Sequence, residues 1–167
     1  MSINLIEFIG FLSFLILGWG LFHKNDIHTK YLIVISCLIG GLYFTLLGLY
    51  ISALMMVFSS VRIITSIYTR STFVGIFFIL FSASTPFWIE SVDWIAALTG
   101  VTGTIGLFWC TRQYFRFVLL VTTFIWIVNA FVYGAWVAFI GECFVFTVGL
   151  IRLIIMINEE NDKYNYR

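Results

Sequence analysis

Long apolar segments alternate with short polar islands along the whole chain. The islands lie at residues 23–30, 70–72, 90–93 and 111–116, and a polar tail covers residues 158–167. A helix of about 20 apolar residues crosses the hydrocarbon core of a bilayer, which is about 30 Å thick. The pattern therefore predicts an all-α membrane protein with seven transmembrane helices. The first two are expected at about residues 3–22 and 31–50. The third runs from the turn that follows the second helix to residue 69. The other four are expected at about residues 73–89, 94–110, 117–133 and 135–157.

Two of the predicted turns, near Gly48 and Gly134, carry no charge. Five or six helices therefore stay open as an alternative, if either apolar stretch is a re-entrant pair. Length favours seven, because residues 31–69 are too many for a single crossing.

The composition requires lipid as the solvent. The chain is 62% hydrophobic and 10% charged, whereas a soluble domain carries about 25% charged residues. Nine Lys and Arg nearly balance eight Asp and Glu, which excludes a nucleic-acid binder with its strong basic patch. The expected partner is the lipid bilayer.

The cations predict an orientation, because cytoplasmic segments of membrane proteins are enriched in Lys and Arg. With the N-terminus outside and the C-terminus inside, the outer loops contain no cation. One outer loop holds Glu90 and Asp93. The cytoplasmic segments then hold Lys24, Lys30, Arg70, Arg112, Arg116, Lys163 and Arg167, with Arg62 and Arg152 toward the inner ends of their helices.

An internal repeat emerges when the chain is shifted by 86 residues. Seven identities fall within positions 8–50, and glycines, hydroxyls and cations fall in register, such as Lys30 with Arg116. After the turn the register slips by four, so that Arg62 matches Arg152. A shift of four helices keeps both copies pointing the same way, as in SWEET-type transporters. The predicted plan is 3+1+3: a three-helix bundle at 1–70, a linker helix at 71–91, a second bundle at 92–158 and a cytoplasmic tail at 159–167.

The chain resembles the YgjV family of bacterial inner-membrane proteins. The resemblance is carried by the stretch from Leu46 to Ser71 and by the stretch that holds Asn129, Glu142, Gly149 and Arg152. It implies a multi-pass protein of the bacterial inner (plasma) membrane. It also implies a transporter-like fold, related in plan to SWEET, PQ-loop and nicotinamide-riboside transporters, without naming a cargo. One departure is that the only proline, Pro86, lies in the linker helix, so a proline hinge in the repeated helices is not expected.

Three ionisable residues are expected inside the membrane: Glu142, Arg62 and Arg152. Charges at this depth are costly and are functional candidates by default. The two arginines have a structural alternative, because a long side chain can extend to the headgroups and keep its charge in water. Glu142 is too short for this and is expected to face a cavity or a partner.

A candidate substrate site follows from one face of the sixth predicted helix. Trp126, Asn129 and Tyr133 are spaced by three and four residues and share that face. Aromatic rings and an amide can stack on and hydrogen-bond a flat polar ligand. Tyr43, Ser59, Ser60 and Glu142 complete the predicted set. The alternative is that these groups only form hydrogen bonds between helices.

Catalytic and cofactor chemistry has no sequence signature here. The two histidines, His23 and His28, lie in the first polar island without ligand partners, and no P-loop or nucleophile elbow is present. We therefore expect no metal, no cofactor and no enzymatic activity.

The leading functional hypothesis is a permease that moves a polar metabolite by alternating access. A receptor or assembly protein on the same fold is the main alternative, and a lipid-modifying enzyme is a weaker one. The sequence leaves open the identity of the substrate, the direction of transport and the coupling ion. It also leaves open the oligomeric state, for which a homo-oligomer is one alternative.

Overall fold

The fold consists of helices throughout the part of the chain that the structure, a computed structural model, describes: residues 3–48, 50–88, 94–132 and 136–165. Seven helices and no strand occur in these ranges. The helices are α1 (Ile3–Phe22), α2 (Asp26–Leu46), α3 (Tyr50–Tyr68), α4 (Thr72–Trp88), α5 (Trp94–Trp109), α6 (Arg112–Val132) and α7 (Trp136–Asn165). The all-α prediction is confirmed for these residues.

Two helices begin earlier than the hydropathy pattern predicted. The predicted starts at residues 31 and 117 were wrong by five residues, because α2 begins at Asp26 and α6 at Arg112. Asn25 caps α2: its side-chain oxygen accepts the Ile27 N–H at 2.9 Å, which satisfies a donor that the helix itself leaves free. Most of each of the islands at residues 23–30 and 111–116 therefore belongs to a helix. His28, which was expected in the first polar island, lies in α2.

The uncharged turn near Gly48 is present as predicted. α2 ends at Leu46 and α3 begins at Tyr50. Gly48 has φ +76°, a left-handed conformation that favours glycine. At the other end of the chain, α7 continues past the predicted end at 157 and reaches Asn165.

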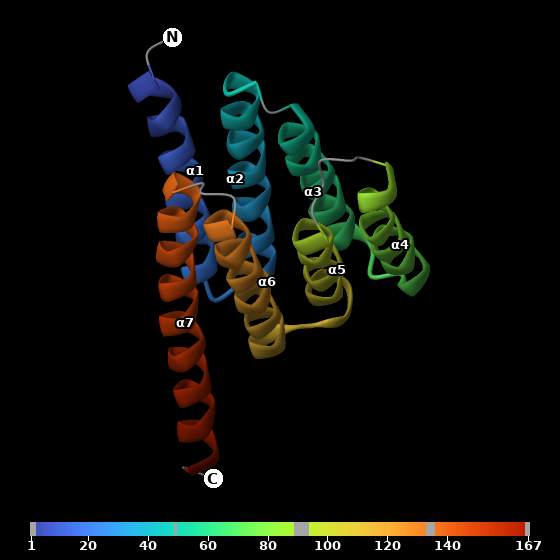
Figure 1. Cartoon of the computed structure of the whole chain (residues 1–167). Coiled ribbons are helices and arrows are strands. Elements are labelled where there is room, and N and C mark those ends of the chain that lie inside the picture. Colours follow the sequence, from blue (N-terminus) through green and yellow to red (C-terminus); the bar gives the residue numbers. More distant parts are fainter. Residues whose placement is uncertain (1–2, 49, 89–93, 133–135, 166–167) are drawn as a thin grey trace.

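Six of the helices form a closed ring in which each contacts the next: α1, α2, α3, α5, α6, α7 and back to α1. α4 packs against α5 and reaches α3 through ring contacts of Phe58 with Phe78 and Phe81. Figure 1 shows that the C-terminus lies at the same end of the bundle as the α1–α2, α3–α4 and α5–α6 connections. We call this the cation-rich end, because Lys24, Lys30, Arg70, Arg112 and Arg116 lie at or near these connections.

Apolar side chains face outward and several charged ones face inward. Phe73 is 86% exposed, while Lys30 is 3% and Arg116 2% exposed. This is the reverse of a soluble protein and fits a lipid environment. Four helices (α1, α2, α6 and α7) are long and apolar enough to cross a bilayer, and the apolar stretches of α3, α4 and α5 are shorter, with 10–17 residues.

The buried core lies toward the cation-rich half of the bundle and joins five helices. It consists of Ile33, Val34, Ile63, Phe78, Leu107, Phe108 and Phe115. The core positions the polar groups described next, because Lys30, Arg62 and Arg116 belong to the same helices.

Candidate functional site

Arg62 of α3 is a buried charge that lies well inside the bundle, and it is 8% exposed. Its Nη1 donates to the Gly100 carbonyl oxygen at 2.6 Å and to Thr104 Oγ1 at 3.2 Å, both on α5. Gly103 makes room for the guanidinium, since a Cβ there would lie 3.3 Å from Nη2. Gly100 and Gly103 of α5 thus both lie against the arginine.

Arg62 extends into the bundle and not to the headgroups at the cation-rich end. Lys30 Nζ bonds both the Ser66 and the Leu107 carbonyl oxygens, so these residues of α3 and α5 lie at one level. Arg62 is four residues further into the bundle and Gly100 seven, or about 6 and 10.5 Å at 1.5 Å per residue. The alternative that Arg62 places its charge in the headgroup region does not fit these contacts.

The charge of Arg62 has only neutral partners. The ion pairs among the described residues join Lys24 to Glu159 and Arg116 to Asp26, and Arg62 takes part in neither. Its Nε has no hydrogen-bond partner. The Ser82 hydroxyl of α4, 1% exposed, is also unpaired, and it lies close to Gly100. Unpaired groups like these are costly inside a membrane protein, which makes Arg62 and Ser82 candidates for a functional site.

Glu142 of α7 lies at a similar depth. The Gly149 position packs against Leu21 and Leu120, and Glu142 is seven residues further into the bundle, about 10.5 Å. Glu142 is partly buried. No hydrogen bond or ion pair joins it to another described residue.

Cys37 of α2 is partly buried and packs against the core. Glu142 lies on the edge of the α7 face that buries Val145 and Gly149, so it faces the bundle. We call Arg62, Ser82, Gly100, Glu142 and Cys37 the interior centre. The sequence singled out Arg62 and Glu142 only. Ser82 has no signal in the sequence, because hydroxyl side chains are common in membrane helices.

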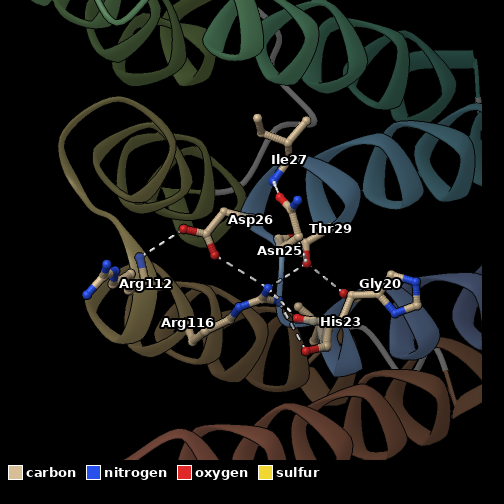
Figure 2. Close-up of polar contacts among 9 residues, drawn as sticks. Gly20, His23, Asn25, Asp26, Ile27, Thr29, Arg112 and Arg116 are labelled. Carbon is tan, nitrogen blue, oxygen red and sulfur yellow. Dashed lines mark hydrogen bonds and ion pairs between the residues drawn. The ribbon is translucent and has the colours of Figure 1, made fainter. Parts of the chain in front are cut away.

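A second polar cluster is built on Arg116 at the cation-rich end (Figure 2). Nη1 of Arg116 donates to the Leu21 carbonyl oxygen at 3.1 Å, and Nη2 donates to the His23 carbonyl oxygen and to Thr29 Oγ1, each at 2.6 Å. Asp26 lies 3.5 Å from Nη2. Arg116 thereby ties α6 to the end of α1 and the start of α2.

Asp26 also accepts the backbone N–H of Arg112 at 2.9 Å (Figure 2). A carboxylate at a helix N-terminus complements the partial positive charge there, so α2 supplies the cap of α6. Arg112 itself has φ +51°, and the bond to Asp26 helps to hold this strained backbone.

Lys30 forms the matching contact in the other half of the bundle. Besides its bonds to Ser66 and Leu107, its ammonium lies 5.7 Å from the centroid of the Phe115 ring. The sequence predicted Lys30 and Arg116 as part of cytoplasmic polar islands. Hydropathy alone gives no signal that both side chains turn inward.

Arg152, aligned with Arg62 in the sequence, has a different environment. It is 4% exposed, its Nε has no partner, and it lies within electrostatic range of Arg116. The position that corresponds to Thr104 at a shift of 86 is Gly18, which offers no hydroxyl. Arg152 follows Gly149, which packs against Leu21 and Leu120, by three residues, so it lies toward the cation-rich end.

The predicted substrate residues lie on separate helix faces. The Tyr43 ring packs against Gly10 of α1. Asn129 lies seven residues after Thr122, which faces Thr102 of α5, so it shares the α5-facing side of α6. Its Oδ1 is buried without a partner.

The structure shows no cluster that joins the other predicted substrate residues to Tyr43 or Asn129 among the described residues. Ser60 bonds the Met56 carbonyl oxygen of its own helix at 3.0 Å. Trp126 and Ser59 are partly buried, and Tyr133 lies outside the described residues. A substrate site made of this set stays a prediction.

Two apolar grooves lie along α1 in the part of the chain that the structure describes. The larger one, ≈ 490 Å³, is lined by Leu15, Gly18, Trp19, Phe22, His23, Phe144 and Val148. The smaller one, ≈ 290 Å³, is lined by Leu12, Leu15, Ile16, Trp19 and Leu32. Neither groove includes a residue of the interior centre, and apolar grooves between helices fit lipid chains.

Comparison with known families decides the identity. The family model Imp-YgjV, described as a bacterial inner membrane protein, matches residues 4–160. The chain belongs to the Imp-YgjV family. This confirms the resemblance seen in the sequence and makes the chain a helical protein of the bacterial inner membrane. No curated protein and no solved structure matches it.

Proposed function

We propose that this Imp-YgjV protein is a small-solute permease. Its two three-helix units, α1–α3 and α5–α7, rock around the interior centre, and α4 links them. All seven helices cross the membrane, with the N-terminus outside and the cation-rich end in the cytoplasm. Alternating access of this kind is common among transporters built from repeats.

The observation that carries the proposal is a reciprocal pair of hydrogen bonds. Lys30 of the first unit donates to the Leu107 carbonyl oxygen of the second, at 3.0 Å. Arg116 of the second unit donates to the Leu21 carbonyl oxygen of the first, at 3.1 Å. Lys30 and Arg116 are 86 residues apart, and so are Leu21 and Leu107. A two-fold axis between the units would exchange these two bonds, which supports the parallel repeat.

Packing inside each unit supports the same relation. A Cβ at Gly20 would lie 2.9 Å from Leu32, and a Cβ at Gly106 would lie 3.0 Å from Val118. These two pairs are also 86 residues apart. At the level of whole helices, the α1–α7 contact corresponds to the α5–α3 contact. The proposed repeat makes these two junctions correspond, although the α1–α7 contact is much more extensive than the α3–α5 contact.

The reciprocal bonds suit a gate. The carbonyl groups near a helix C-terminus carry partial negative charge and bind cations, and water can replace a lysine or arginine donor when the units separate. In the proposed orientation, this conformation is closed on the cytoplasmic side. Rocking the units apart at this end would break both bonds together.

The test is solute uptake into liposomes that contain the purified protein. Liposomes are incubated with an isotopically labelled bacterial metabolite extract, and the solutes inside are identified by mass spectrometry. We expect at least one solute to accumulate above the level in protein-free liposomes, in a saturable way. Tight binding of a solute with no uptake would contradict the permease and favour the receptor alternative.

A further inference from the structure

Arg62 carries a charge that its described neighbours do not neutralise. A guanidinium keeps its proton even when it is buried, and Arg62 is 8% exposed. Its hydrogen bonds go to the Gly100 carbonyl oxygen and the Thr104 hydroxyl, both of them neutral. Neither of the ion pairs among the described residues includes it. A buried cation without a counterion is costly, and the binding of an anion lowers that cost.

One edge of the Arg62 guanidinium is free. Both of its hydrogen bonds to described residues come from Nη1, and Nε has no partner. Nε and Nη2 form the other edge, whose two parallel N–H bonds match the two oxygens of a carboxylate. Gly103 lies beside this edge, since a Cβ there would be 3.3 Å from Nη2. The glycine therefore leaves Nη2 uncovered.

Ser82 of α4 adds a third donor. Its hydroxyl is 1% exposed and has no hydrogen-bond partner, whereas a hydroxyl in a helix commonly bonds a carbonyl of its own helix, as Ser60 does. A Cβ at Gly100 would lie 2.8 Å from Ser82 Oγ and 3.7 Å from Arg62 Nη1. The hydroxyl and the guanidinium thus approach the same point of α5, and donors this close can bind one small anion.

We propose that the solute is a small monocarboxylate, whose carboxylate binds Nε and Nη2 of Arg62 and the Ser82 hydroxyl. This inference rests on the proposed permease function and names the class of its cargo.

Charge and space select this class of solute. The residues of the site supply one positive charge, so a monoanion neutralises it, whereas a dianion leaves a net negative charge at membrane depth. An uncharged solute leaves the charge of Arg62 without a counterion, and a cation adds a like charge. Gly100 and Gly103 bring the α5 backbone against the arginine, which favours a small solute.

The site lies between the two units, as alternating access requires. Arg62 belongs to α3 of the first unit, Gly100 and Thr104 belong to α5 of the second, and Ser82 belongs to the linker helix α4. The burial of Arg62 and Ser82 closes the site in this conformation. Moving α3 away from α5 would separate Nη1 from its neutral partners and open the guanidinium to a solute.

Binding can be tested by thermal stabilisation of the detergent-purified protein. The probes are the sodium salts of acetate, propionate, glycolate, lactate and pyruvate, the matching uncharged amides, and inorganic phosphate, all at equal ionic strength. We expect at least one monocarboxylate to bind, and its amide to bind at least about tenfold more weakly. The absence of any binder, equal binding of the amide, or tighter binding of phosphate would overturn the proposal.

Variants at Arg62 and Gly103 test the free edge. Arg62→Gln should lower the affinity for the best monocarboxylate at least about tenfold. Arg62→Lys keeps the charge but loses the planar edge, so its affinity should lie between the two. Gly103→Ala keeps the charge and covers Nη2, so it should also weaken binding. Unchanged affinity in Arg62→Gln would overturn the proposal.

Ser82→Ala separates a role in binding from a role in stability. The hydroxyl has no partner in the protein without solute, so its removal should not lower the melting temperature of that protein. The affinity for the monocarboxylate should nevertheless fall at least about threefold, because a hydrogen bond to a charged group is lost. Unchanged affinity would overturn the assignment of Ser82, whatever happens to stability.

Arg152→Gln is the matched control, because Arg152 is a buried arginine that lies toward the cation-rich end. It should change the affinity less than about twofold, and a loss equal to that of Arg62→Gln would overturn the assignment to Arg62. Uptake into liposomes separates this inference from the permease itself. A bound monocarboxylate that is never taken up contradicts only the permease. Uptake of an uncharged solute that Arg62→Gln leaves unchanged contradicts only the monocarboxylate.

Discussion

Replacing Arg116 by alanine is expected to destabilise the protein more than any other single change at the cation-rich end. The substitution removes four polar contacts, to Leu21, His23, Thr29 and Asp26. Removing one member of a buried charged network costs about 3 kcal/mol. For a chain of this length that corresponds to a fall in melting temperature of roughly 6–12 °C. Thermal unfolding in detergent measures it.

Two further variants make the Arg116 experiment specific. Arg112→Ala changes an arginine of the same helix whose side chain is exposed, and it should alter stability by less than about 0.5 kcal/mol. Arg116→Lys keeps the charge but loses the planar fork, so it should fall between the other two. If Arg112→Ala and Arg116→Ala lower the melting temperature equally, Arg116 does not tie the units together.

Replacing Lys30 by methionine is expected to open the cation-rich end. Methionine keeps most of the apolar stem but removes the donors to Ser66 and Leu107, which join α2 to α3 and α5. Cys37 lies two turns further into the bundle than Lys30 and reports on access. In a protein with Cys110→Ser and Cys143→Ser, a membrane-impermeant thiol reagent added at this end should label Cys37 at least tenfold faster after Lys30→Met.

Lys24→Met is the control for this experiment. Lys24 lies at the same end and pairs with Glu159 at 2.7 Å, but its side chain is 71% exposed. Exposed pairs contribute little, so its removal should leave the labelling rate of Cys37 unchanged. Equal acceleration in both lysine variants, or none in Lys30→Met, would show that the Lys30 bonds do not close the bundle.

Hydropathy predicted the helices well because lipid imposes a simple rule on them. Apolar stretches of about 20 residues must be helical when they cross a bilayer. All seven predicted helices occur in the described residues, and four of them are long and apolar enough to cross. The starts of α2 and α6 were placed late because Lys30 and Arg116 are polar, and a hydropathy pattern treats a polar residue as a loop. Their burial depends on carbonyl groups of other helices, which no local pattern contains.

The interior centre was only half visible in the sequence. Arg62 and Glu142 were found because charges are rare in apolar segments. Whether Arg62 turns to the headgroups or into the bundle depends on Gly100 and Thr104 of α5, which are distant in sequence. Trp126 and Asn129 were grouped because they share a helix face, yet the neighbours of that face are set by packing. Asn129 lies toward α5, while Glu142 belongs to α7, on the edge of the face that buries Val145 and Gly149.

The most direct test of the central claim is the accessibility of Cys37 from the two sides of the membrane. The protein that retains only this cysteine is reconstituted into sealed vesicles, and an impermeant thiol reagent is added from one side or the other. Alternating access predicts that Cys37 is labelled from both sides, and that a transported solute slows labelling from each. Labelling from one side only, unchanged by any solute that the vesicles accumulate, would contradict it.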